Sequence, residues 1–379
     1  MKLSDVCEIN PRSQAISDDT LVSFVAMPDV SEDGKINTSV VRPYGEVKKG
    51  YTVFQEGDIL FAKITPCMEN GKGALAVGLQ NGIGVGSTEF HVLRPNTDFL
   101  EGMWLYYLTA WPTFRHEAEK HMTGSAGQKR VPKAFLERYQ IEIPILNEQK
   151  HQVSQLSRIR RIIESRQRQL RTLDTLINAR FVEMFDDGES PMKTVEELCS
   201  EIVDCPHTTP RYEGELKHPA IRTSEIKKGY IAWDTMRYVS DEEYEERVAR
   251  LRPEKGDIVY GREGTFGNAA ILPGGYSFCL GQRVMLLRPD YSKCTSEYLL
   301  HAVISDDVYR QAVEKNNAST VAHVNVKDVK QFKVPLPSFE KQKRFAYYVS
   351  QVDKSKAAVQ AALDKTQLLF DSLMQQYFG

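Results

Sequence analysis

Short polar loops, rich in glycine, threonine and basic residues, follow several strand-like runs of this chain. AKITPCMENGKG (62–73) and GVGSTEF (84–90) lie in the first half, and DCPHTTPRY (204–212) and KGDIVYGREGTFG (255–267) lie in the second. Glycine lets a backbone come close to a ligand, and Thr, Asn, His, Lys and Arg side chains suit contacts to phosphate oxygens and base edges. These loops indicate contacts to nucleic acid.

Two further loops are polar and built from small residues, KHMTGSAGQKRVPK (120–133) and NNASTVAHVNVK (316–327). The first has four basic residues and no acidic one, so we expect it to be the best local phosphate-binding patch. Its basic residues are Lys120, Lys129, Arg130 and Lys133.

Individual side chains in these loops suit the reading of bases. Arg262 follows a strand-like run and is expected to reach guanine in a major groove, and Asn70 is expected to pair with adenine; each good bidentate contact discriminates by about 1–3 kcal/mol. The predicted DNA-binding residues are Lys63, Thr65, Asn70, Lys72, Ser87, Thr88, Ser125, Gln128, Lys129, Arg130, His207, Thr208, Thr209, Arg211, Arg262, Thr265, Gln282, Arg283, Thr320 and His323.

Each of these signals also has a purely structural interpretation. A single Lys or Arg can be a solvated surface cation, Thr208 and Thr209 beside Pro210 can form only a turn, and His207 can be a core or turn histidine. The acidic run at 240–246 is expected to be a solvated helix start.

Catalytic motifs are missing from the sequence. Gly71 and Lys72 are followed by Gly73 rather than by the pattern of a phosphate-binding loop, and neither H-E-x-x-H nor G-x-S-x-G occurs. NPRS (10–13) is not the aromatic Asn-Pro-Pro signature of adenine methylation. None of the six cysteines forms a CxxC pair, so we expect reduced thiols and no metal site. The sequence therefore predicts a protein that recognises nucleic acid but does not catalyse a reaction.

Composition sets the broad class of the protein. The chain has 379 residues, 49 Lys+Arg, 51 Asp+Glu and a net charge of −2, with 41% hydrophobic and 26% charged residues. These values predict two or three domains and exclude a mostly disordered or collagen-like chain. No apolar run approaches the roughly 20 residues of a membrane span. MKLSDVCEINPR lacks the apolar core of a signal peptide, so we expect a cytoplasmic protein.

The chain contains a long internal repeat. The two GDI triplets begin 199 residues apart, EFHVLRP and RVMLLRP end 194 apart, and IEIPILNEQK and KVPLPSFEKQK end 193 apart. LSDVCEI is echoed by VEELCSEI, whose cysteines are 192 apart. The preserved order indicates a tandem duplication of a whole domain.

Each copy has the same predicted plan. Strand-like runs and Gly/Pro turns come first, a short helix is expected near 100–108 and 296–304, and an extended segment ends at Pro144 or Pro335. A long helix follows, from about Glu148 to Phe185 in the first copy and from near 340 almost to the last residue in the second.

Both long helices show apolar residues at seven-residue spacing, which indicates a coiled coil. The alternative is that each helix packs only on its own domain. The repeating positions are Leu156, Ile163, Leu170, Ile177 and Met184 in the first helix and Val349, Leu363, Phe370 and Tyr377 in the second.

The predicted fold is therefore a pair of mixed α/β (α+β) domains, duplicated in tandem and joined by two long antiparallel coiled-coil helices with an approximate two-fold axis. The expected segments are domain one at 1–146, helix one at 147–187, domain two at 188–338 and helix two at 339–379.

The motifs GDILFAKITPCMENGK, GQKRVPKAFLERYQIEIP, DCPHTTPRY, GDIVYGREGTFG and VPLPSFEKQK, in this duplicated order, resemble the specificity (S) subunit of type I restriction–modification enzymes over essentially the whole chain. The resemblance implies two target recognition domains, each reading one half of a split, asymmetric DNA sequence. It also implies that the helices act as a ruler between the half-sites.

The resemblance further implies partners: double-stranded DNA, two modification subunits that carry S-adenosylmethionine chemistry, and ATP-driven, Mg-dependent restriction subunits. This chain is expected to bind no cofactor, metal or membrane itself. Two alternatives remain open, a self-contained DNA methyltransferase or nuclease, and a coiled-coil scaffold without a role on DNA.

Overall fold

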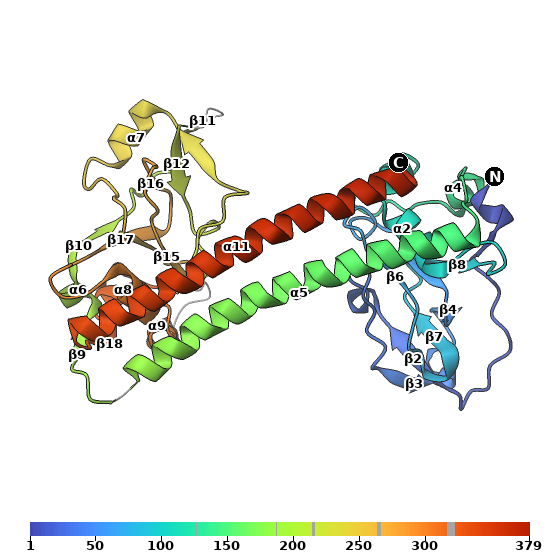
Figure 1. Ribbon diagram of the computed structural model, residues 1–379, viewed down its shortest axis with the longest axis horizontal. Coiled ribbons are helices and arrows are strands. Elements are labelled where there is room, and N and C mark those ends of the chain that lie inside the picture. The colour runs from blue at the N-terminus through green and yellow to red at the C-terminus, as the bar shows by residue number, and fades with distance from the viewer. Residues whose placement is uncertain (126, 187, 214–216, 264–266, 317–322) are drawn as a thin grey trace. The chain divides into compact units, whose positions relative to one another are not determined.

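The computed structural model describes residues 1–379 except 126, 187, 214–216, 264–266 and 317–322. The chain divides into two compact units, unit 1 (Met1–Gln167 with Ala362–Gly379) and unit 2 (Arg168–Ala361). Each unit contains one mixed α/β domain and parts of both long helices (Figure 1). The predicted fold class and tandem duplication are confirmed. Within the described residues, no helix combines the length and apolarity needed to cross a bilayer.

Unit 1 contains two four-stranded sheets. The main sheet is antiparallel, and the second sheet contains one parallel pair, β2 with β7. The main sheet runs in the order β1 (Cys7–Ile9), β8 (Phe90–Pro95), β5 (Ile59–Ala62), β6 (Gly73–Leu75), and the second in the order β3 (Val41–Pro43), β2 (Leu21–Val25), β7 (Ile83–Gly86), β4 (Thr52–Gln55).

The central strand β5 is buried on both faces. Because successive side chains of a strand point to opposite faces, Ile59 and Phe61 join the core beside the helices, whereas Leu60 and Ala62 join the core beside the second sheet. The other helical segments of unit 1 are η1 (Leu3–Asp5), η2 (Met27–Asp29), α1 (Tyr44–Val47), η3 (Gln80–Gly82), α2 (Gly102–Ala110), α3 (Pro112–Lys120) and α4 (Lys133–Arg138).

Unit 2 repeats this plan with two four-stranded sheets of its own, and β12 and β16 form the parallel pair. The main sheet runs β10 (Cys199–Asp204), β17 (Val284–Pro289), β14 (Ile258–Gly261), β15 (Ala269–Ile271), and the second runs β11 (Tyr212–Glu213), β13 (Arg237–Val239), β12 (His218–Ile221), β16 (Cys279–Leu280). A small sheet pairs β18 (Lys333–Pro335) with β9 (Met192–Thr194), and the helices are α6 (Val195–Leu198), α7 (Asp241–Arg247), α8 (Ser296–Val303), α9 (Asp306–Asn316) and α10 (Val326–Lys330).

The sequence repeat reappears as a repeated strand register. Cys7 lies opposite Pro95 in unit 1, and Cys199 lies opposite Pro289 in unit 2. The GDI strand is likewise antiparallel to the LRP strand in both units. The repeated landmarks are therefore equivalent positions of one duplicated domain.

The aspartate of each GDI triplet forms a buried ion pair with the arginine of the LRP strand. Arg94 Nη2 lies 2.7 Å from Asp58 Oδ2, and Arg288 Nη2 lies 2.8 Å from Asp257 Oδ2. Both carboxylates are almost completely buried. The hydrogen bonds to the buried aspartate raise the pKa of each arginine, so both guanidinium groups stay charged.

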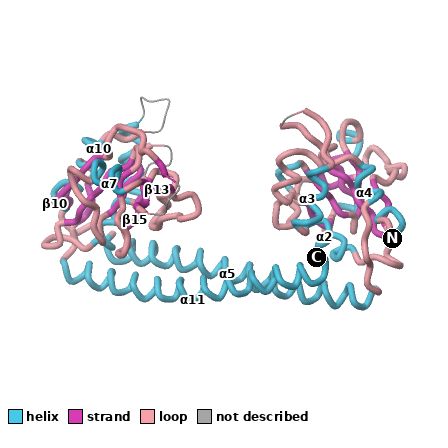
Figure 2. The backbone as a smooth tube through the Cα atoms, turned by 90° about the horizontal axis from the view of Figure 1, so that it is seen from above, coloured by secondary structure: helices cyan, strands magenta, loops and turns pink. Residues whose placement is uncertain are grey.

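The two long helices, α5 (Leu146–Phe185) and α11 (Phe339–Phe378), pair within each unit (Figures 1 and 2). In unit 1, Tyr377 donates to Gln155, and Arg166 donates to the carbonyl of Ala362. Partners that advance along α5 therefore retreat along α11, which makes the pair antiparallel.

The same direction holds in unit 2. Lys356 Nζ lies 2.6 Å from Asp174 Oδ1, and the Phe345 ring lies 5.3 Å from the Phe185 ring. The predicted antiparallel pairing is confirmed, and the alternative of a helix that packs only on its own domain is wrong. The heptad positions Leu156, Ile163 and Ile177 are buried, whereas Leu170 and Met184 are half-buried.

Candidate nucleic-acid interface

Three loops of unit 1 meet at the end of β5, and we call this meeting point the three-loop junction. The amide of Lys63 donates to the carbonyl of Glu89 at 2.9 Å, and the amide of Val131 donates to the carbonyl of Lys63 at 2.9 Å. The amide of Thr65 donates to the carbonyl of Lys129 at 3.0 Å. The loops that carry most of the predicted site residues of this half therefore form one surface.

Ion pairs hold most of the basic loop at 120–133 in place. Arg130 binds Glu89 through two nitrogens, at 2.8 Å and 2.9 Å, and this contact lowers the pKa of the Glu89 carboxyl. Lys120 pairs with Glu117 and Lys133 pairs with Glu137. The loop itself has no acidic residue, but three glutamates from other segments, Glu89, Glu117 and Glu137, pair with its cations. Among the described residues, Lys129 is its one cation without an ion pair.

The remaining predicted residues of this half differ in how far their polar groups are engaged. Thr65 donates to Glu69 at 2.7 Å, Lys72 donates to the carbonyl of Met27, and the Ser87 hydroxyl accepts from the Glu89 amide. Half-buried Lys63 and exposed Thr88 line a cleft of about 320 Å³. Asn70, Ser125 and Gln128 have exposed side chains on the loops.

Unit 2 builds the same junction at the end of β14. The amide of Arg262 donates to the carbonyl of Arg283 at 3.0 Å, and the amide of Val324 donates to the carbonyl of Arg262 at 2.9 Å. These bonds match those of Lys63 and Val131 in unit 1. The backbone of the junction is therefore duplicated, although its side chains differ.

Arg262 is buried, whereas the sequence predicts an exposed side chain that contacts a base. It is 6% exposed, and its Nη2 lies 2.7 Å from Asp204 Oδ1. Because the guanidinium is turned into the domain, it ties the end of β14 to β10 and is not presented to a ligand.

Arg283 and His323 meet at one carboxylate. Arg283 Nε lies 2.8 Å from Glu263 Oε2, and His323 Nδ1 lies 3.1 Å from Glu263 Oε1. The Arg283 side chain is 63% exposed, and its backbone has a left-handed φ of 65°, which turns this residue out of the β17 ladder. The predicted residues Thr265 and Thr320 lie outside the described residues.

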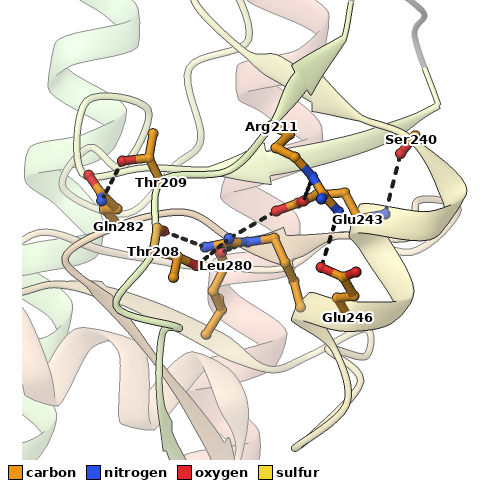
Figure 3. Close-up of polar contacts among 9 residues, drawn as sticks. Thr208, Thr209, Arg211, Ser240, Glu243, Glu246, Leu280 and Gln282 are labelled. Atoms are coloured by element: carbon orange, nitrogen blue, oxygen red, sulfur yellow. Dashed lines mark hydrogen bonds and ion pairs between the residues drawn. The ribbon is translucent and has the colours of Figure 1, made fainter.

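The 204–212 loop contacts Gln282 (Figure 3), the residue before Arg283 in the chain. Gln282 Nε2 donates to Thr209 Oγ1 at 2.9 Å, and His207 is largely exposed. Arg211 pairs with Glu243 at 2.7 Å and with Glu246 at 3.1 Å. The structure therefore brings Thr209 to Gln282, while Arg211 is held by acids of α7.

Two residues that sequence reasoning missed support this loop, Arg247 and Glu243. Buried Arg247 donates to the carbonyls of Thr208 and Leu280 and to Glu243 (Figure 3). The run at 240–246 does start a helix, capped by Ser240, but Glu243 is buried rather than solvated. The i, i+4 spacing of Glu243 and Arg247 was the available signal.

The described residues contain no cluster of three or more His, Cys, Asp or Glu side chains that could hold a metal ion. All six cysteines are unpaired. Burial raises the pKa of the Cys7 and Cys279 thiols to about 12, so both stay protonated and are poor metal ligands and nucleophiles at neutral pH.

Comparisons with known proteins agree on one family. The model of the type I restriction modification DNA specificity domain matches residues 1–174 and 214–365. The EcoAI specificity subunit of Escherichia coli is 36% identical over 280 residues, which cover 72% of this chain and 46% of that protein. The EcoEI specificity subunit of the same species is 35% identical, with the same coverage. The chain spans about half the length of these curated relatives.

Solved structures share the fold. A chain from work on complex assembly and conformational transition of the type I R-M system has a TM-score of 0.58 at 19% identity, covering 100% of this chain and 96% of its own. The type I restriction–modification S subunit of M. genitalium has a TM-score of 0.57 at 15% identity, covering 100% of this chain and 95% of its own. At such identities the likeness concerns the fold alone.

Proposed function

Because the chain belongs to the family of type I restriction modification DNA specificity domains, we propose that it is the non-catalytic DNA specificity subunit of a type I restriction–modification complex. Each α/β domain reads one half of a bipartite, asymmetric DNA site. The long helices set the gap between the halves and dock the modification subunits.

The duplicated junction is the observation that carries this proposal. Two of its backbone hydrogen bonds are the same in both units, whereas the equivalent side chains differ: Lys63 corresponds to Arg262, and Glu89 corresponds to Arg283. A constant frame with different polar groups suits two readers of different sequences, because backbone geometry positions a protein on DNA while side-chain chemistry specifies the bases.

The exposed groups around each junction supply the proposed contacts. In unit 1, Gln128 offers an amide for adenine and Lys129 a charge for phosphate. In unit 2, Arg283 offers a guanidinium for guanine, once DNA competes with Glu263, and half-buried Gln282 offers an amide, once DNA competes with Thr209. Buried Arg262 is left out of this set and is assigned a positioning role.

The long helices suit a spacer. A 40-residue helix extends roughly 60 Å, which exceeds the 34–36 Å or so of one turn of B-DNA. We therefore propose that base pairs between the half-sites are not read directly.

The chemistry is assigned to partners. Two modification subunits would supply the S-adenosylmethionine reaction at adenine, and restriction subunits would supply the ATP- and Mg-dependent steps, with no cofactor or metal bound by this chain. Reduced, unpaired cysteines agree with a cytoplasmic location.

The test is a selection from random duplex DNA by the chain assembled with its modification subunits. We expect one bipartite sequence with a single gap length, bound in a salt-dependent manner. Selection of no sequence would contradict the proposal and favour a scaffold. Methyl transfer or cleavage by the chain alone, with S-adenosylmethionine and Mg²⁺, would instead favour a self-contained enzyme.

A further inference from the structure

Each long helix has a completely buried glutamine in its first turn. Gln149 is the fourth residue of α5 and Gln342 is the fourth residue of α11, and both have an exposed fraction of 0%. Full burial is unusual for a polar side chain unless all of its hydrogen bonds are made. The two residues are 193 apart, within the repeated NEQK and EKQK motifs.

In unit 1 the Gln149 amide joins the helix to two other segments. Its Oε1 accepts from the amide of Glu101, the N-cap residue of α2, at 2.9 Å. Its Nε2 donates to the carbonyls of Phe99 and Pro144, each at 2.8 Å. Phe99 and Glu101 belong to the domain, whereas Pro144 lies just before the helix.

In unit 2 the Gln342 amide makes the same three bonds. Its Oε1 accepts from the amide of Thr295, the N-cap residue of α8, at 3.0 Å. Its Nε2 donates to the carbonyls of Lys293 at 3.1 Å and Pro337 at 3.0 Å. The arrangement is therefore kept in both copies, although many surrounding side chains have changed.

The chemistry of these positions requires an amide of this length. The site presents one donor and two acceptors, and a primary amide offers one acceptor oxygen and two donor hydrogens. A glutamate carboxylate would face two carbonyl oxygens without a proton, and alanine would leave three buried backbone groups unpaired. The site thus selects glutamine and fixes both its position and its orientation.

We propose that Gln149 and Gln342 are positioning residues that fix the register and angle at which each domain is held at the start of its long helix. Through this, they set the gap between the two half-sites. The inference rests on the proposed function and adds to it the residues that make the helices an accurate ruler.

The experiment compares Gln149→Ala and Gln342→Ala with the wild-type chain, each assembled with modification subunits. Gln169→Ala on α5 and Gln351→Ala on α11 are matched controls, because both glutamines are exposed. The probe is a panel of duplexes that carry the selected wild-type half-sites with gaps shortened or lengthened by one or two base pairs. One base pair shifts a half-site by about 3.4 Å.

We expect the wild-type complex and both controls to prefer one gap by about tenfold or more, because a wrong gap must be absorbed by deforming the DNA. Either alanine variant, Gln149→Ala or Gln342→Ala, should reduce this preference to about threefold or less, because a loosely held domain can follow a shifted half-site without deforming the DNA. Base preference within each half-site should stay unchanged. A merely structural residue would lower binding to all gaps equally, and that result would overturn the inference.

If either alanine variant fails to fold, Gln149→Glu and Gln342→Glu keep the side-chain size and are assayed at pH 5.5 and pH 8. The protonated acid can restore one donor, so gap preference should return at the lower pH; an unchanged gap profile at both pH values overturns the inference. Failure of the wild-type complex to select a bipartite site would refute the proposed function. Failure of the glutamine variants to change the gap preference would refute only this inference.

Discussion

The two units differ where the helix pair packs on the domain. In unit 1, the Arg160 guanidinium lies over the rings of Tyr106, Tyr107 and Phe370, 5.4, 5.1 and 5.7 Å from their centroids. Arg160 stands eleven residues after Gln149. These aromatic contacts fill the space between helix and domain.

In unit 2 the equivalent space is an open cleft of about 1060 Å³. The residue eleven positions after Gln342 is Asp353, and the rings are replaced by Leu300, His301 and Ile177. Burial raises the pKa of the Asp353 carboxyl and lowers that of His301 to about 4. Both titratable groups are thus biased toward their neutral forms.

The loop that carries Gly34 and Lys35 in unit 1 is also packed more closely than its counterpart in unit 2. Lys35 lies 3.3 Å from Glu164 on α5, and Gly34 is packed so closely on Tyr106 that a Cβ would lie 2.1 Å from its hydroxyl oxygen. At the counterpart Gly229, a Cβ would meet nothing within 4 Å. The buried glutamines and the Arg–Asp pairs are therefore shared by the two units, while the face between helix and domain differs.

Removal of the shared Arg–Asp pair should have the largest effect, and an equal one in both units. Asp58→Ala and Asp257→Ala each remove the buried carboxylate that an arginine and one backbone amide bind, which should cost about 3–5 kcal/mol. Urea unfolding monitored by hydrogen exchange in each domain measures the loss. A loss confined to one unit would mean that the frame is not shared.

Acidification should destabilise unit 2 through His301. Burial lowers the folded-state pKa of His301 from its ordinary 6.5 to about 4, so its stability contribution is complete above pH 6.5 and is lost as the pH falls toward 4. The shift corresponds to roughly 3 kcal/mol. His301→Tyr, which introduces the residue of unit 1, should flatten the dependence of unit 2 stability on pH between 6.5 and 4. An unchanged pH profile would argue against a buried neutral histidine.

Alanine substitutions of Gly34 and Gly229 should have smaller effects on stability, and the two variants can be compared directly. Both have a positive φ, so Gly34→Ala and Gly229→Ala share a strain of about 1–2 kcal/mol. Only Gly34→Ala also meets a packed ring, which should add about 1–3 kcal/mol. Equal losses in thermal unfolding of the two variants would show that unit 1 is not packed more tightly here.

Local patterns predicted the scaffold well. The seven-residue spacing predicted both long helices, because each apolar position depends only on neighbours along the helix, and the ordered repeats predicted two equivalent domains. The repeat also contained Gln149 and Gln342, but the sequence does not show that both are buried with three partners.

The candidate site was less predictable, because partners of opposite charge lie far apart in the chain. Arg130 is neutralised by Glu89, 41 residues away, and Arg262 by Asp204, 58 residues away. A count of charges within one loop therefore overestimated the cations available to DNA. Exposed Gln128 and Lys129 and half-buried Gln282 remain predicted DNA-binding residues, as proposals.

The most direct test changes one junction and determines the DNA sequence selected. Lys63→Ala with Gln128→Ala should alter base preference in one half-site, and Gln282→Ala with Arg283→Ala should alter the other, with the gap unchanged in both cases. Selection of random duplexes by each assembled complex would measure this. Altered preference in both half-sites after a change in one unit, or in neither, would contradict two independent readers in one chain.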